Sequence, residues 1–147
     1  LHTNDAPQTL SRMINMGVAP FNIASAVSLI IAQRLARRLC KDCKKPAEIP
    51  KAALVEEGFT QKESATLRIY KPVGCDQCTN GYKGRVGIYQ VMPVSLAMQQ
   101  IIMANGNALQ LAEQAQIEKV PDLRQSGLEK VRQGLTSLEE VNRVTKE

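Results

Sequence analysis

The chain has 147 residues, which is enough for one domain or for one domain with a small appended module. Hydrophobic residues make up 44% and charged residues 22%, values typical of globular proteins, and this excludes a disordered or collagen-like chain. The net charge of +5 could favour an anionic partner, but three tyrosines, two phenylalanines and no tryptophan offer few platforms for stacking nucleic-acid bases.

Two helices are predicted before the first cysteine. Asp5 or Thr9 can cap a helix over residues 7–16, and Pro20 opens a longer helix that extends to about Leu39. The apolar part of this second helix is well short of the about 20 residues needed to cross a bilayer, so no transmembrane helix is expected. The stripe that predicts the second helix consists of Ala24, Val27, Ile31 and Leu35, widened by Ile23 and Ile30.

The pattern changes between Cys40 and about Arg85, where paired cysteines, prolines and glycines mark a series of turns. One short helix is predicted at Pro50–Glu57. Alternating apolar residues predict two short strands, at Leu67–Ile69 and Val86–Ile88, which we expect to pair antiparallel on either side of the second cysteine pair. This segment is therefore predicted to be a distinct small module.

Helical signals return after Met92 and continue to the end of the chain. Each predicted helix follows a capping residue or a proline, and Gly106 and Gly134 are natural stops. The chain is therefore predicted to be mainly α, interrupted by the cysteine module. The predicted helices cover Leu96–Ala104, Ala108–Gln116 and Leu123–Gln133, and a capping box at Thr136–Glu139 opens a further one.

The four cysteines form two C-x2-C pairs, Cys40 with Cys43 and Cys75 with Cys78, separated by 31 residues. A gap of two residues lets a tight turn aim both thiolates at one point, and two such turns complete the tetrahedral sulfur set that zinc prefers. The separation exceeds the about 15–20 residues usual in zinc ribbons, so we expect the helix at Pro50–Glu57 to be looped out between the turns. Four sulfur ligands leave no open coordination position, which predicts a structural zinc ion.

Two other states of the cysteines are open at this point. Two disulfides are one alternative, although the sequence shows no secretory leader and paired C-x2-C turns are a poor disulfide framework for a chain with this much apolar core. A redox-active dithiol is the other, although it needs one activated pair between a strand and a helix, whereas this chain has two matched pairs. Both alternatives predict a protein without bound metal.

Four segments resemble the C-terminal part of the bacterial type II secretion and type IV pilus assembly ATPases. Leu-His-Thr-Asn-Asp-Ala at 1–6 is similar to the His box of this family, and residues 32–40 resemble the helix that leads into its metal module. Residues 74–89 resemble the second cysteine turn and the strand after it, and residues 127–141 resemble the closing helices. The tetracysteine element favours a secretion or pilus extension ATPase over a pilus retraction ATPase.

The resemblance covers essentially the whole chain and implies a fold and a division into three parts. The fold is the helical C-terminal part of a RecA-like ATPase domain with an inserted tetracysteine zinc module that contains a short antiparallel strand pair. Residues 1–39 would be helices of the ATPase core with the His box at their start. Residues 40–85 would be the zinc module, and residues 86–147 a C-terminal strand and helical subdomain.

The sequence contains no G-x-x-x-x-G-K-[ST] motif, so it lacks the phosphate-binding loop of a P-loop ATPase. Because the chain begins with Leu1, we expect an excised piece that is inactive alone, with ATP and Mg²⁺ bound by a core upstream. By resemblance, His2 is the catalytic candidate of the intact motor, near the γ-phosphate, whereas in an excised piece it would be a frayed terminal residue. Arg34 could face nucleotide or a neighbouring subunit, or only water at a helix end, and Arg85 could bridge the metal module to the core.

The resemblance implies a hexameric cytoplasmic ATPase, peripheral to the inner membrane, that powers type IV pilus assembly or type II secretion. Its zinc module would relay motion to neighbouring subunits of the homo-hexamer or to an inner-membrane platform protein. One alternative is a zinc-ribbon module that binds nucleic acid, and another is a purely structural interaction domain. Because acidic residues interrupt the basic run and it holds no aromatic residue, no nucleic-acid partner is expected. The basic run consists of Arg34, Arg37, Arg38, Lys41, Lys44, Lys45 and Lys51.

Overall fold

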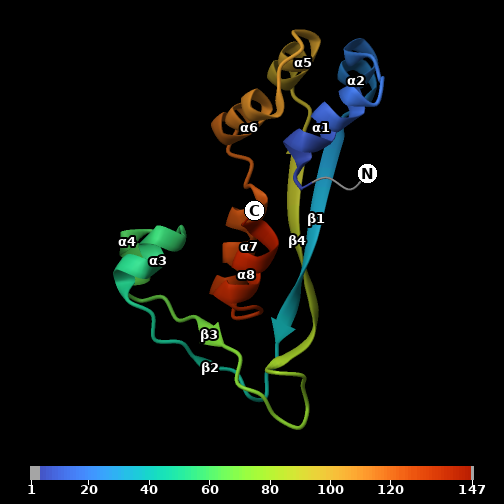
Figure 1. The fold of residues 1–147 in the computed structure, drawn as a ribbon. Coiled ribbons are helices and arrows are strands. Elements are labelled where there is room, and N and C mark those ends of the chain that lie inside the picture. Colours follow the sequence, from blue (N-terminus) through green and yellow to red (C-terminus); the bar gives the residue numbers. More distant parts are fainter. Residues whose placement is uncertain (1–3, 147) are drawn as a thin grey trace. The chain divides into compact units, whose positions relative to one another are not determined.

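The computed structural model describes residues 4–146, which divide into two compact units. The helical unit contains residues 4–33 and 89–123, and the cysteine unit contains residues 34–88 and 124–146. The mainly helical class expected from the sequence is confirmed (Figure 1). The elements are α1 Ala6–Asn15, α2 Pro20–Ala26, β1 Leu29–Leu39, β2 Lys45–Pro46, α3 Lys51–Glu57, α4 Gln61–Ser64, β3 Tyr70–Lys71, β4 Tyr82–Pro93, α5 Leu96–Met103, α6 Ala108–Ile117, α7 Leu123–Arg132 and α8 Leu138–Thr145.

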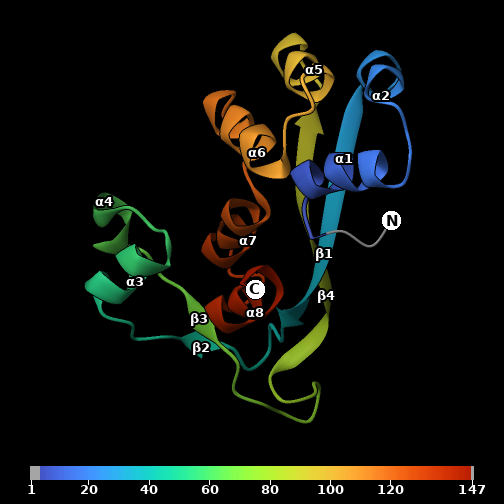
Figure 2. The same ribbon diagram turned by 45° about the horizontal axis from the view of Figure 1, so that its top comes forward.

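The helical unit is built around an apolar core between four helices. Helix α1 packs against α6, α2 packs against α5, and α5 packs against α6 (Figures 1 and 2). Burying one large apolar side chain stabilises a fold by about 1.5–3 kcal/mol, so this core provides most of the stability of the unit. Its fully buried side chains include Leu10, Ile23, Met98, Ile102 and Leu111.

Helix α1 confirms the helix predicted over residues 7–16 and selects one of its two capping candidates. The carboxylate of Asp5 accepts a hydrogen bond of 2.9 Å from the backbone N–H of Gln8, which satisfies a free donor of the first turn. The hydroxyl of Thr9 instead donates to the backbone oxygen of Asp5. Gly17 follows the helix with a φ of 94°, a left-handed conformation that glycine adopts without strain.

The prediction of a helix over residues 20–39 is wrong beyond Ala26. Helix α2 ends there, and the chain becomes extended in strand β1, Leu29–Leu39. Ile30 and Ala32 are buried while the residues beside them are exposed, which is the two-residue period of a strand. The same apolar residues also fit a helical period, and pairing with a distant strand decides between the two.

The strands form two separate two-stranded sheets. Strands β1 and β4 pair and run in opposite directions, and each contributes residues to both units (Figure 1). Strands β2 and β3 pair antiparallel, with Lys45 opposite Lys71. The predicted pairing of residues 67–69 with 86–88 is therefore wrong, because residues 86–88 lie in β4 and β4 pairs with β1. The sequence shows which segments alternate, but it does not show which of them meet.

The remaining predicted helices are present, with one change of cap. Helix α3 corresponds to the prediction at 50–57, and α5, α6 and α7 correspond to the three helices predicted after Met92. Ser137, one residue later than predicted, caps α8 by accepting a hydrogen bond from the backbone N–H of Glu140. Thr136 instead donates its hydroxyl hydrogen to the backbone oxygen of Arg37, 2.7 Å away, which ties the start of α8 to β1.

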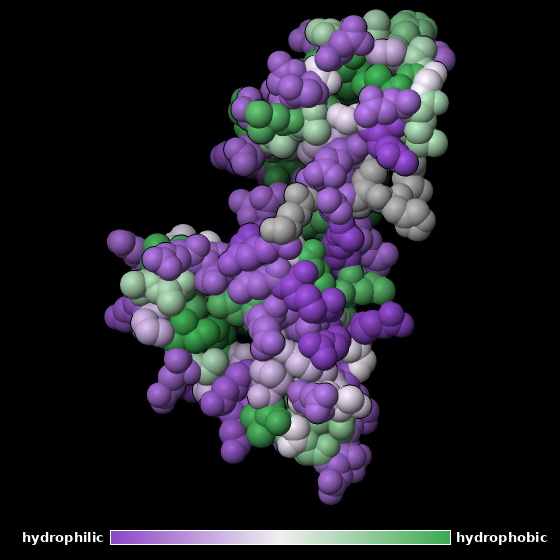
Figure 3. Space-filling view, in the orientation of Figure 1, coloured by the Kyte–Doolittle hydropathy of each residue, from purple (hydrophilic) through white to green (hydrophobic). Residues whose placement is uncertain are grey.

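The surface is mostly polar on the face that Figure 3 shows, with separate apolar areas between the polar groups. Within residues 4–146, none of the helices combines the length and the apolar character that crossing a membrane requires.

Candidate metal centre

The two cysteine turns of the cysteine unit bring four sulfur atoms to one place. Cys40 directly follows β1 and is buried, and Cys43 lies at the end of the next turn. Cys75 and Cys78 lie in the turn that precedes β4, and Cys75 is exposed. The backbone N–H of Cys40 donates to the oxygen of Gly81 at 2.9 Å, which joins the two turns. All four sulfurs lie within 4.8 Å of one another.

The spacing of the sulfurs matches that of a tetrahedral metal site. The sulfur atoms of Cys40 and Cys75 are 3.8 Å apart, those of Cys43 and Cys78 are 3.7 Å apart, and those of Cys75 and Cys78 are 3.6 Å apart. Four sulfurs placed about 2.3 Å from a central zinc ion lie about 3.8 Å from each other. A disulfide bond is only about 2.05 Å long, and all four cysteines are free. The four cysteines could therefore hold one metal ion.

The acidities of the thiols also favour a bound cation. Burial by itself would raise the pKa of Cys78, but hydrogen bonds from the backbone N–H of Cys75 and from neighbouring thiols lower that pKa to about 7. The N–H of Gln77 acts to lower the pKa of Cys75, yet burial and the hydrogen bond with Cys78 raise it to about 12. Zinc binds the thiolate form of cysteine, so an ion held among the four sulfurs would favour their deprotonation.

One lysine connects the first cysteine turn to the helices at the end of the chain. Lys44, next to Cys43, donates from Nζ to the backbone oxygen of Gly134 at 2.8 Å. The same ammonium lies 4.6 Å from the centre of the Tyr70 ring in β3. A shift of the cysteine turn therefore acts directly on the loop between α7 and α8 and on the β2–β3 pair.

A buried carboxylate that was not predicted lies in the same unit as the metal centre. The side chain of Glu140 in α8 is 0% exposed and is bound by Arg37 of β1 and by Arg143. Arg37 donates to it from Nη2 at 2.7 Å, from Nε at 3.0 Å and from its backbone N–H at 2.7 Å. Burial by itself would raise the pKa of Glu140, but the hydrogen bonds from Arg143 and Arg37 lower it to about 2.

The sequence predicts Arg37 in the last turn of a helix that extends to about Leu39, and this does not suggest a carboxylate partner 103 residues away. The only available signal was the acidic residue three positions after Ser137, a common first-turn pattern that does not imply burial. The other arginines of interest also change their setting, because Arg34 lies in β1 and Arg85 in β4. A role for either toward nucleotide or the core stays a prediction. His2 lies outside the described residues, and its catalytic role also stays a prediction.

A family model for type II/IV secretion system proteins matches residues 1–143. The chain therefore belongs to the type II/IV secretion system protein family, and the resemblance seen in its sequence is confirmed.

Individual relatives narrow the comparison to two kinds of ATPase. The chain is 59% identical over 147 residues to the type IV pilus assembly ATPase PilB of Pseudomonas aeruginosa, covering 100% of the chain and 26% of that protein. It is 56% identical over 149 residues to PilB of Acinetobacter baylyi, with coverage of 100% and 26%. It is 43% identical over 148 residues to the type II secretion system ATPase E of Vibrio cholerae, with coverage of 100% and 29%. The chain spans about a quarter of the length of these relatives.

Proposed function

We propose that the chain is the C-terminal part of a cytoplasmic ATPase that powers type IV pilus assembly or type II secretion. In this proposal Cys40, Cys43, Cys75 and Cys78 hold one Zn²⁺ ion. The observation that carries the proposal is the tetrahedral spacing of the four sulfurs in a chain of this family. Relatives named as ATPases of both systems, at 59% and 43% identity, support the assignment.

The zinc ion is structural in this proposal. Four sulfur ligands fill the tetrahedral coordination sphere, so no position is left where a water molecule could be activated. The cysteine turns and the two-residue strands β2 and β3 offer little apolar surface to bury, and metal binding supplies folding energy that such a segment otherwise lacks. The ion stiffens the module rather than taking part in a reaction.

ATP and Mg²⁺ are bound elsewhere in the full-length protein. This sequence has no phosphate-binding loop with a lysine and a Mg²⁺-binding hydroxyl, so the chain by itself is inactive as an ATPase. His2 is the only carried-over candidate for the active site, and its imidazole would donate to a phosphate oxygen or pass a proton near neutral pH.

The zinc module acts as a rigid arm that relays movement. Residues 1–39 belong to the ATPase core, residues 40–85 form the module, and residues 86–147 form the C-terminal subdomain. The hydrogen bond from Lys44 to Gly134 supports a relay, because it couples the first cysteine turn to the C-terminal helices. The resemblance implies that the arm acts within a homo-hexamer, peripheral to the inner membrane, on neighbouring subunits or on a platform protein.

Nucleic acid is not the partner in this proposal. Stacking of bases needs exposed aromatic faces. Two rings of the cysteine unit are already covered, because Arg37 lies 4.3 Å from the centre of Tyr82 and Lys44 lies 4.6 Å from the centre of Tyr70.

Metal analysis of the purified chain tests the zinc site. We expect about one zinc ion per wild-type chain and none in Cys75→Ser, since a hydroxyl is a poor ligand for a zinc site built from thiolates. Cys75 is exposed, so this variant disturbs packing least, and Ser25→Ala in the exposed part of α2 is the matched control. Wild-type chain with four titratable thiols and no metal contradicts the zinc site.

Nucleotide assays test the division of labour. The full-length protein, assayed beside the 147-residue chain, should hydrolyse ATP with Mg²⁺ while the chain shows no turnover. Turnover by the chain alone, or none by a folded full-length protein, contradicts the proposal.

A further inference from the structure

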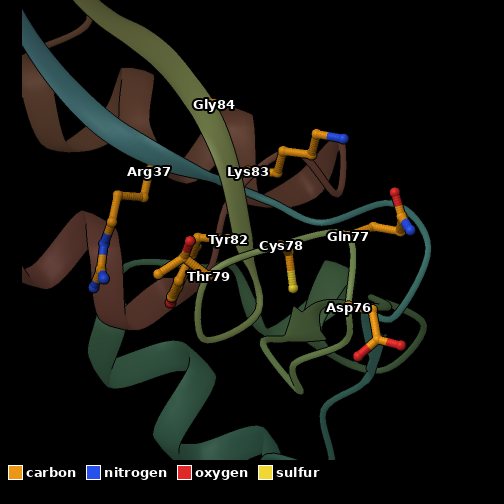
Figure 4. Close-up of a pocket in the computed structure, with 8 residues that line it drawn as sticks. All are labelled: Arg37, Asp76, Gln77, Cys78, Thr79, Tyr82, Lys83 and Gly84. Carbon is orange, nitrogen blue, oxygen red and sulfur yellow. The ribbon is translucent and has the colours of Figure 1, made fainter.

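A hollow of about 560 Å³ lies in the cysteine unit beside the second cysteine turn. Figure 4 shows its lining, in which Arg37 lies on one side and Asp76 lies on the opposite side of Thr79, Tyr82 and Cys78. The volume is sufficient for one or two side chains of a docked segment. Among the lining residues, Cys78 is a proposed metal ligand and the backbone N–H of Gln77 donates to the sulfur of Cys75.

Arg37 is presented to this hollow in a fixed orientation. Its guanidinium is held by the buried carboxylate of Glu140 and lies 4.3 Å from the ring centre of Tyr82, whose hydroxyl is hydrogen-bonded to Ser137 at 2.7 Å. Even so, 46% of the Arg37 side chain is exposed. A guanidinium has five N–H donors in a planar fork, and in the described part of the chain the bonds to Glu140 use only Nε and one N–H of Nη2. The other donors remain available to a ligand.

The charges at the two ends of the hollow differ in sign. Arg37 and Arg143 share the carboxylate of Glu140, and the charge of Glu139 also acts on the neighbouring Tyr82. Asp76 at the other end is exposed and has no ion pair among the described residues, and Lys83 lies on the rim. The hollow therefore presents an oriented arginine with free N–H donors at one end and a carboxylate at the other.

We propose that this hollow docks a segment of a partner protein that carries an acidic and a basic side chain. The acidic side chain pairs with Arg37 through the free donors of its fork, and the basic side chain lies beside Asp76. This inference rests on the proposed function, because it names the contact through which the zinc arm engages its partner. Arg37 acts as the anchor of the contact, since arginines are frequent hot spots of interfaces.

The mixed charge favours a protein over a polyanion as the occupant. A lipid surface or a nucleic acid presents phosphates on all sides, and the carboxylate of Asp76 repels them. The Tyr82 ring is covered by Arg37 and cannot stack on a base. A protein segment can place charges of opposite sign at the two ends of the hollow.

Titration of the ¹⁵N-labelled, zinc-loaded chain with short peptides tests this site. The probes are three capped Ser/Gly peptides with one Glu and one Lys separated by two, three or four residues, each with a counterpart in which Gln replaces Glu. We expect the amide signals of Gln77, Thr79 and Gly84 to shift with one of the Glu peptides and its Gln counterpart to bind about tenfold more weakly.

Variants at the two ends of the hollow test whether Arg37 and Asp76 bind the peptide. Arg37→Lys should weaken binding of the Glu peptide about tenfold, because an ammonium cannot reproduce the oriented fork. Asp76→Asn keeps the shape of an exposed side chain between Cys75 and Cys78; once its zinc content is shown to equal that of the wild type, it should weaken binding of the Glu peptide and strengthen binding of phosphatidylglycerol vesicles. Lys62→Gln, an exposed lysine of α4 outside the hollow, is the matched charge control and should change binding less than about twofold.

The proposal is overturned if a folded, zinc-loaded chain shows no shift of these amides with any Glu peptide, or an equal shift with the Gln counterparts. It is also overturned if vesicles or duplex DNA shift the same amides and Asp76→Asn leaves that binding unchanged. If these amide signals shift with protein concentration in the chain alone, a second copy of the chain occupies the hollow. That result would overturn the proposal that a different protein binds there. A chain that binds no zinc contradicts the proposed function instead, so the two failures are distinguishable.

Discussion

The two units of this protein are stabilised in different ways. The helical unit packs four helices around apolar side chains such as Leu10 and Ile102 and carries few charges. The cysteine unit contains most of the charged residues, four converging sulfurs and ion pairs that join its elements, including Arg124 with Glu57 and Arg132 with Glu63. The charged residues of the helical unit are Asp5, Arg12, Glu113, Glu118, Lys119 and Asp122.

This difference shows how ion pairs and converging thiols can add to the burial of apolar side chains. Where helices present apolar stripes, burial alone is sufficient. The cysteine unit also buries apolar side chains, including Phe59, Ile88 and Val131, and adds ion pairs and four converging sulfurs that could hold a metal ion. The stability of the cysteine unit should therefore fall on metal removal, on loss of a buried charge and in acid. The stability of the helical unit should fall when a helix cap is removed. The expected effects decrease in that order.

Removing the metal should have the largest effect. Cys40→Ser, or dialysis of the wild-type chain against a chelator, should abolish metal binding. Such sites contribute on the order of 10 kcal/mol to folding, and a large part of this free energy should be lost. Amide hydrogen exchange should accelerate across residues 40–78 and stay slow in α1 and α6. Equal loss of protection in both units would show that they do not differ as described.

Loss of the buried carboxylate of Glu140 should have the second-largest effect on stability. Glu140→Ala leaves Arg37 and Arg143 without their shared partner and should lower the free energy of unfolding by about 3–5 kcal/mol, measured by urea denaturation. Glu139→Ala removes a more accessible carboxylate one residue earlier in α8 and should change it by less than about 0.5 kcal/mol. A similar loss in the two variants would contradict the central role of Glu140.

Acid should lower the stability of the cysteine unit, because it protonates the same carboxylate of Glu140. The pKa of Glu140 lies at about 2 in the folded chain, below its ordinary value of 4.5, so its ionised form stabilises the fold above that ordinary value. This contribution, about 3 kcal/mol, should decline as the pH falls from about 5 toward 2. Denaturation curves at several pH values should show this slope in the wild-type chain and a smaller one in Glu140→Gln. Equal slopes would be the contrary result.

A cap in the helical unit should have the smallest effect. Asp5→Ala leaves the N–H of Gln8 without its acceptor and should lower the free energy of unfolding by about 1 kcal/mol. Glu113→Ala, which removes a carboxylate of α6 in the same unit, serves as the control and should change little. The loss in Asp5→Ala should be the same with and without metal, as judged by thermal unfolding. A metal-dependent loss would link the two units.

Local features of the fold and the metal ligands were predictable from the sequence. The gap of two residues within each cysteine pair makes a tight turn, and two such turns suffice to predict that Cys40, Cys43, Cys75 and Cys78 meet. Most helices begin at a residue whose side chain can cap them, and Ser95 and Asn107 do so as predicted. The resemblance to secretion and pilus ATPases was also carried by local segments, and the family match confirms it.

Apart from the short helix α4 and the cap of α8, the features that escaped prediction depend on residues far apart in the chain. Residues 29–39 have an apolar pattern that suits a helix as well as a strand, and pairing with β4 makes them a strand. Because they are a strand, Arg37 meets the carboxylate of Glu140, and a residue expected at a helix end becomes one wall of a hollow.

The sequence by itself determined the helix starts, the two cysteine turns and the family, because each depends on residues within a few positions of one another. Only the tertiary structure decided that β1 is a strand, that Glu140 is buried between two arginines, and that Arg37 and Asp76 lie at opposite ends of one hollow. Backbone hydrogen bonds and charges are satisfied by whichever partner the fold brings within reach, and a linear pattern does not contain that partner.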